Sequence, residues 1–135
     1  MARSCRGLVF GFTGRPEEGV EEGRLALRLS PRDWYRFLFL HDLACCHYAA
    51  RDYPATVEAA AKVVALNPDY FYGHQLHAMS CAQLGQTERA HAAFLEAQRL
   101  IPNFDLALAK EYAPYMDPAD LEHELDGLRK AGWVL

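Results

Sequence analysis

The 135-residue sequence lacks the features that mark several common classes of protein. It contains no uninterrupted apolar run of the roughly 18 residues that a membrane-spanning helix needs. It has 14 Lys and Arg against 18 Asp and Glu, which gives a net charge of −4. That balance argues against non-specific binding of nucleic acid, because such binding depends on basic side chains that neutralise phosphates. We therefore expect neither membrane insertion nor nucleic-acid binding.

Motifs for cofactors and metals are missing as well. The four cysteines form neither a CxxC motif nor a Cys/His cluster with zinc-finger spacing, and the glycines fit neither nucleotide-binding fingerprint. His74 and His77 have i, i+3 spacing, but a metal site on that face would want a further ligand, and only Cys81 is near. We interpret the cysteines as small buried side chains that suit a reducing compartment. A cytoplasmic protein with no cofactor and no metal site is expected.

Nucleophilic catalysis by cysteine requires a neighbouring base and a group that orients that base. Two His–Cys pairs have the i, i+4 spacing that permits contact on one helix, but the sequence shows no third, orienting residue for either. We therefore predict no catalytic residues and no enzyme. The two pairs are His41 with Cys45 and His77 with Cys81.

What the sequence does contain is repetition. Three apolar runs end at Pro31, Pro68 and Pro102, which lie 37 and 34 residues apart. Each proline marks the end of a helix, because it has no N–H and clashes with the preceding turn. Turn residues divide the units into halves at 14–16, 51–54 and 85–87. The period predicts stacked helix pairs, with helices at about 2–13, 16–29, 32–50, 54–66, 69–84, 87–100, 103–113 and 118–131.

The second helix of each pair places small and larger side chains at i, i+4 and i+7, which is one face of a helix. Small residues on that face allow a partner helix to approach closely, and a larger residue fills the space behind it. The three sets are Gly19, Gly23 and Ala26; Thr56, Ala60 and Val63; and Ala90, Phe94 and Ala97.

This pattern resembles the tetratricopeptide repeat, which has a period of about 34 residues, a turn with glycine or Asp-Tyr, an Ala-x3-Phe-x2-Ala second helix and a terminal proline. The resemblance implies an all-α fold in which antiparallel helix pairs stack as a short right-handed superhelix with a C-terminal capping helix. It implies one domain over 1–135, with units at about 1–31, 32–68 and 69–102, then a partial unit and the capping helix in 103–135. The matching residues are Leu43-Ala44, Asp52-Tyr53, Leu66 and Pro68 in the second unit, and Leu84-Gly85, Ala90, Phe94, Ala97, Leu100 and Pro102 in the third.

In this family the first helices line a concave groove that binds a segment of a partner protein. The groove positions of this sequence carry an aromatic, almost uncharged set, which suits an apolar segment or an amphipathic helix. The resemblance therefore implies a non-catalytic scaffold for protein–protein interaction. The candidate groove residues are Phe12, Leu38, His41, Cys45, Tyr48, Tyr72, Gln75, Met79 and Gln83.

Chaperone-binding members of the family hold a peptide's carboxylates with a clamp of Lys, Asn and Arg. His41, Cys45 and Gln75 stand at the corresponding places here, and only Lys110 could contribute a cation. Recognition of a carboxylate-terminated chaperone tail is therefore not expected.

Two alternative functions remain open. The segments 27–33, 65–70, 115–122 and 127–132 are similar to the C-terminal repeat regions of bacterial class III adenylate/guanylate cyclase-like proteins and some transcriptional regulators. That similarity implies a bacterial regulatory module, without cyclase activity of its own. The other alternative is a homodimer or larger self-assembly, because the first expected helix carries Gly7 and Gly11 among large apolar residues.

Overall fold

A computed structural model of the protein describes residues 13–29, 36–112 and 115–134. Within these ranges the regular structure is entirely helical, with no β-strand. The all-α fold is confirmed, whereas the expected helix over 2–13 lies outside the described residues. The helices are α2 (Pro16–Leu29), α3 (Arg36–Ala49), α4 (Tyr53–Leu66), α5 (Phe71–Gln83), α6 (Thr87–Leu100), α7 (Leu106–Tyr112) and α8 (Pro118–Ala131).

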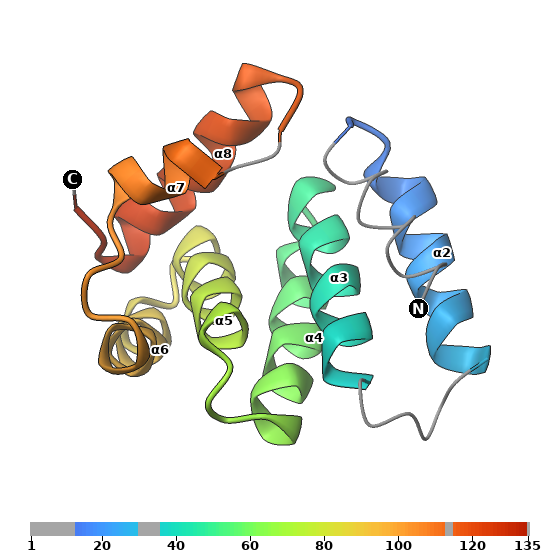
Figure 1. The fold of residues 1–135 in the computed structure, drawn as a ribbon, viewed down its shortest axis with the longest axis horizontal. Coiled ribbons are helices and arrows are strands. Elements are labelled where there is room, and N and C mark those ends of the chain that lie inside the picture. Colours follow the sequence, from blue (N-terminus) through green and yellow to red (C-terminus); the bar gives the residue numbers. More distant parts are fainter. Residues whose placement is uncertain (1–12, 30–35, 113–114, 135) are drawn as a thin grey trace.

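The helices from α2 to α6 pack in chain order, each against the next, as Figure 1 shows. Consecutive packing of this kind is typical of a helical-repeat array, in which each unit covers the apolar face of its neighbour. In the described ranges, no helix combines the length and the apolar character that a bilayer span requires.

Small residues let the helices of this array approach closely. The sets predicted to face a partner helix are buried in α2, α4 and α6, with only Phe94 partly exposed. At the joint between α4 and α5, a Cβ on Gly73 would lie 2.8 Å from Cγ1 of Val63, so only glycine fits there without a shift. Ala60 and Ala97 have no exposed surface. The predicted packing faces are confirmed.

The helix starts follow from local hydrogen bonding. Asp52 and Asp117 cap α4 and α8, since their carboxylates accept from the backbone N–H of Ala55 (3.3 Å) and Ala119 (2.9 Å). The start of α5 was expected at residue 69, and this is wrong by two residues. Asn67 accepts a bond from the backbone N–H of Asp69, which holds a turn there until Phe71.

The last helix departs from simple stacking. α8 packs chiefly against α5, with smaller contacts to α6 and α7, so it folds back over the array instead of extending it. Figure 1 shows α7 and α8 lying obliquely across the ends of the helices that precede them. The predicted capping helix therefore exists at its predicted residues, but it covers the side of the array to which α3 and α5 contribute.

An apolar stripe and an aromatic cluster hold α8 in this position. Leu125 and Leu128 are fully buried against the array. Beyond the helix, the indole of Trp133 meets the ring of Phe94 edge-on at 4.8 Å and lies 6.0 Å from Phe104. Edge-to-face aromatic pairs add to the apolar burial that fixes a helix in place.

The closest approach of α8 is at Gly127. A Cβ at this position would overlap the hydroxyl of Tyr48 in α3 and lie 3.4 Å from Cβ of Met79 in α5. The missing side chain therefore determines how near α8 comes to both helices.

Gly127→Ala tests this packing. Alanine favours a helix over glycine by about 1 kcal/mol, so the substitution would stabilise α8 if space were available. We expect a net loss of roughly 1–3 kcal/mol in the free energy of unfolding instead, because the new methyl group displaces Tyr48. Urea denaturation measures it, and a variant more stable than the parent protein would contradict the packing.

A double-mutant cycle provides the control. Tyr48→Phe deletes the overlapping oxygen, so Gly127→Ala should be less harmful in that background than in the parent protein. If Gly127→Ala lowered the free energy of unfolding equally in the parent protein and in Tyr48→Phe, the loss would not come from overlap with the Tyr48 hydroxyl.

Candidate functional site

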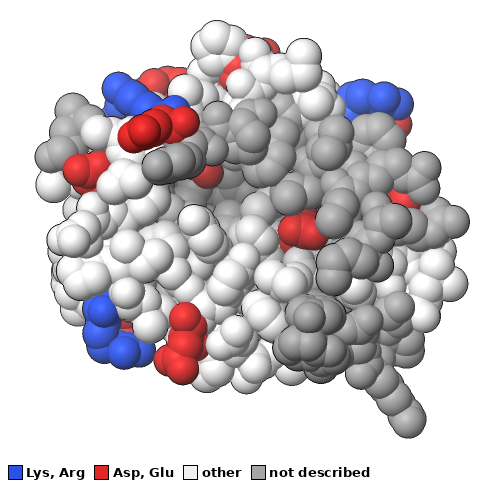
Figure 2. Space-filling model, in the orientation of Figure 1, with Lys and Arg blue, Asp and Glu red and all other residues white. Residues whose placement is uncertain are grey.

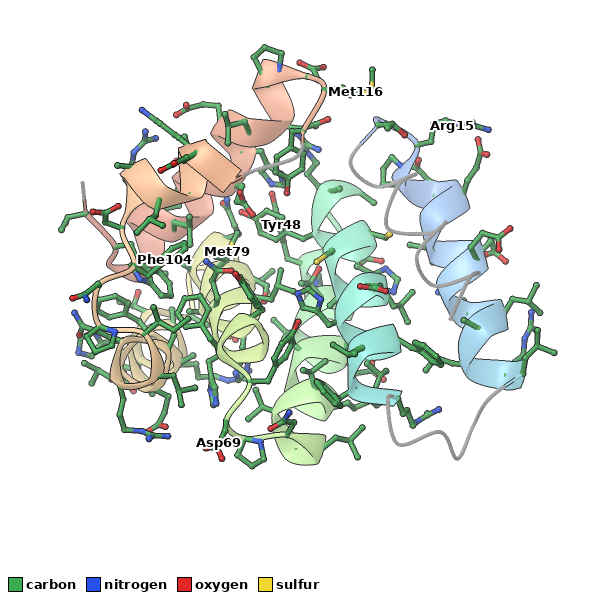
Figure 3. The ribbon with its side chains drawn as sticks, viewed as in Figure 1. Arg15, Tyr48, Asp69, Met79, Phe104 and Met116 are labelled. Atoms are coloured by element: carbon green, nitrogen blue, oxygen red, sulfur yellow. The ribbon has the colours of Figure 1, made fainter. Side chains whose placement is uncertain are left out.

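A cavity of about 500 Å³ lies between α3, α5, α7 with the segment that leads into it, and α8. In Figure 3, Tyr48, Met79 and Phe104 mark three of the elements around it. Its wall is mainly apolar, with a few polar groups. It is lined by His41, Cys45, Tyr48, Tyr72, Gln75, Leu76, Met79, Ile101, Asn103, Phe104, Leu108, Ala109, Tyr115 and Glu124.

Most of the groove residues predicted from the sequence meet in this cavity. Those that line it are His41, Cys45, Tyr48, Tyr72, Gln75 and Met79. Leu38 is half-buried and is not among the lining residues. Gln83 is bonded to α8 instead. Phe12 lies outside the described residues, as do Gly7 and Gly11, on which the self-association hypothesis depends.

Aromatic rings form one edge of the cavity where α3 meets the start of α5. The His41 ring lies 5.3 Å from that of Tyr70 and 5.9 Å from that of Tyr72, and the two tyrosines are 5.7 Å apart. Tyr72 is 45% exposed. A partly exposed aromatic ring beside an apolar cavity offers contact area with little loss of side-chain entropy on binding.

Polar groups close the opposite edge, where α8 meets α3. The Tyr48 hydroxyl donates to the carbonyl of His123 (3.0 Å), and the two rings stack at 4.3 Å. The same hydroxyl accepts from the amide of Gln83 (3.2 Å), which also donates to Asp126 (3.3 Å). Nζ of Lys130 donates to the side-chain amide oxygen of Gln83 (3.0 Å). Two predicted groove residues, Tyr48 and Gln83, thus bind the protein's own C-terminal helix.

Glu124 and Tyr115 complete the cavity, and the sequence reasoning missed both. Burial raises the pKa of Glu124 to about 7, and a hydrogen bond from Tyr115 opposes the shift. Burial also raises the pKa of Tyr115, with Glu124 nearby as a second cause. A signal existed in the sequence: Leu121, Glu124, Leu125 and Leu128 follow the i, i+3, i+4, i+7 pattern, so an acid stands in an apolar stripe.

The His41–Cys45 pair is in contact, with Nε2 and Sγ 3.5 Å apart. Burial, reinforced by the negative charge of Asp42, raises the pKa of the Cys45 thiol well above its ordinary value. The thiol is therefore protonated at neutral pH, and the pair lacks the thiolate that attacks a substrate. Burial also raises the pKa of Cys81.

One of the histidines considered as a metal ligand, His74, has a partner in the backbone. Nε2 of His74 is 2.7 Å from the carbonyl oxygen of Pro68, a distance at which the ring N–H donates to that oxygen. Across the described ranges, no three His, Cys, Asp or Glu side chains come together in a position to hold a metal ion.

Comparison with known proteins returns no relatives: no protein-family model matches the sequence, and neither a curated protein nor a solved structure matches it significantly. The fold and the cavity therefore carry the functional argument.

His123, which stacks on Tyr48 from α8, is expected to make the stability of the fold dependent on pH. Burial lowers the pKa of His123 to about 4, and Tyr53 holds its Nε2 at 2.7 Å from the phenol oxygen. Below pH 6.5 the unfolded chain therefore binds a proton that the folded chain does not. Above pH 6.5 the neutral His123 costs the folded state nothing. The free energy of unfolding then falls as the pH falls from 6.5 toward 4.

We expect the free energy of unfolding to lose roughly 1–2 kcal/mol between pH 7.5 and pH 5 through His123, after allowance for its partial exposure. His123→Phe keeps an aromatic ring against Tyr48 but cannot titrate, so the variant should lack this loss. Denaturant unfolding at both pH values measures it. The difference between the two proteins isolates His123 from His47 and His77, whose pKa values burial also lowers. Identical pH profiles would contradict the assignment.

Proposed function

We propose that this protein is a non-catalytic, cytoplasmic scaffold of the tetratricopeptide-repeat type, and that its cavity binds a short segment of a partner protein. The observation that carries the proposal is the convergence of six predicted groove residues on one cavity of about 500 Å³. That volume lies within the range typical of ligand-binding pockets, roughly 300–1,000 Å³.

The chemistry of the wall supports a peptide ligand. Leu76, Met79 and Phe104 supply apolar surface, and methionine adapts to side chains of different shape. Gln75 and Asn103 supply amide donors and acceptors that can fix the orientation of a backbone. A mainly apolar pocket with a few polar groups is the usual composition of a specific binding site.

The position of α8 limits the length of the ligand. Tyr48 and Gln83 are engaged by α8, so one side of the α3–α5 surface is already covered. A ligand that enters from the Tyr72 side meets this helix at the far wall. We therefore propose a short apolar segment or one turn of an amphipathic helix, which would insert a few side chains.

Tyr72→Ala tests the proposal without disturbing the core, because Tyr72 lies at the mouth of the cavity and is 45% exposed. Peptides selected from a displayed library of random 12-residue sequences, and then measured by fluorescence anisotropy, should bind this variant at least tenfold more weakly. A tenfold loss corresponds to about 1.4 kcal/mol, which is typical of a central aromatic contact.

Leu95→Ala is the matched control. Leu95 is similarly exposed, at 50%, but belongs to α6 and does not line the cavity. Removal of the Leu95 side chain should change the affinity for the selected peptides less than twofold. Equal losses in the two variants, or a library without binders, would overturn the proposed function.

A further inference from the structure

We propose that the cavity selects a ligand segment that carries a basic side chain, Lys or Arg, among apolar residues, and that Glu124 receives the cation. This inference rests on the proposed function and adds the chemistry of the ligand. It stands on the placement of one acid within an otherwise uncharged cavity.

Among the described residues that line the cavity, Glu124 is the only Asp, Glu, Lys or Arg. It projects from the apolar stripe of α8 that packs on α5, between the fully buried Leu125 and the half-buried His123. A carboxylate withdrawn from water is unfavourable unless a partner compensates its charge. In the described ranges its carboxylate has a hydrogen bond from Tyr115, a neutral phenol that does not compensate the negative charge.

Two basic side chains of the described residues, Lys130 and Arg51, pair with carboxylates other than that of Glu124. Nζ of Lys130 lies 2.9 Å from the carboxylate of Asp126, and Nη1 of Arg51 lies 3.6 Å from that of Asp120. In the view of Figure 2, the Lys and Arg side chains lie at the periphery of the face and the centre is free of them among the described residues. Among the described residues, the lining of the cavity therefore carries the acid Glu124 and no Lys or Arg.

The surroundings of Glu124 suit a long basic side chain better than a compact cation. The methylene stem of lysine or arginine can pack along Met79 and Phe104 while its charged end reaches the carboxylate. The tyrosine rings that line the same cavity also attract cations through their faces. Tyr48, Tyr72 and Tyr115 are those rings.

Charge also excludes the opposite ligand. An acidic segment would bring a second carboxylate toward Glu124 in a site with little water, where like charges repel strongly. The positions at which related grooves carry a basic clamp hold His41, Cys45 and Gln75 here. The charge preference of this cavity is therefore the reverse of a carboxylate clamp.

Matched peptides test the inference. Apolar 12-residue peptides are synthesised in triplets that are identical except for one central residue, which is Lys, Met or Glu. Met resembles Lys in length and lacks its charge. We expect the full-length protein at pH 8 to bind the Lys peptide on the order of tenfold more tightly than the Met peptide, since a charge-assisted contact is added, and to bind the Glu peptide least.

Glu124→Gln supplies the matched protein variant, because it keeps the shape and removes the charge. In this variant the Lys and Met peptides should bind equally, because the charge that distinguishes them is gone. Circular dichroism at pH 6 and pH 8 checks that the variant retains its helices. Tyr72→Ala should weaken both the Lys peptide and the Met peptide.

The preference for Lys should also grow between pH 6 and pH 8, since Glu124 ionises near pH 7. The other titratable groups that face the cavity are His41, Cys45 and Tyr48 from α3, Tyr72 from α5 and Tyr115 before α8. Glu124→Gln leaves all five in place, so the difference between the two proteins isolates Glu124.

The outcomes separate the two proposals. If Met peptides bind in a Tyr72-dependent manner but Lys gives no advantage, or if its advantage persists in Glu124→Gln, the cation inference fails and the binding scaffold stands. If no peptide binds in a Tyr72-dependent manner, both fail.

Discussion

The contact between Gly127 and Tyr48 is the constraint on which the rest of the structure depends. It allows α8 to lie against α3 and α5 at a distance that no side chain at 127 would permit. Because α8 is seated there, the Tyr48 hydroxyl reaches the carbonyl of His123 and the amide of Gln83. The same seating turns an open surface of the array into a cavity with a far wall. A single missing methyl group thus governs both the packing of the last helix and the shape of the candidate site.

On the inner face of α8, the residue that would best stabilise the fold differs from the residue that the proposed binding needs. An apolar residue at position 124 would complete the stripe formed by Leu121, Leu125 and Leu128, and it would remove the penalty of withdrawing a carboxylate from water. The chain carries Glu124 there instead, with a pKa near neutrality. Buried acids with raised pKa values occur often at functional positions, and structural networks perturb pKa values as well. Here the hydrogen bond from Tyr115 compensates the acid only in part, and this is the basis of the proposal that the charge of a ligand matters.

The helices could be predicted from the sequence because their limits are local. A proline follows α2 and α6 in the sequence, Asp117 begins α8 and small residues recur on one face, so these three helices have the predicted bounds. The path of α8 could not be predicted, since periodicity identifies an apolar stripe but not the surface that will cover it. The same limit applies to the site. His41, Tyr72 and Met79 follow from the positions of the repeat, whereas Asn103, Tyr115 and Glu124 enter the cavity only because the chain folds back. Glu124 alone left a trace, as an acid within a leucine pattern.

Tyr48 lines the cavity and also packs in the core. This double position limits the substitutions that such a protein can accept there. Its ring is 2% exposed and lines the cavity, and its hydroxyl joins α3 to both α5 and α8. A substitution that altered ligand preference at this position would loosen three helices together. Tyr72 and Leu108 line the cavity but are both exposed, so they do not combine that position with one in the core. Among descendants of this chain, variation in specificity should therefore accumulate at the mouth of the cavity, while Tyr48 and Gly127 change only as a pair.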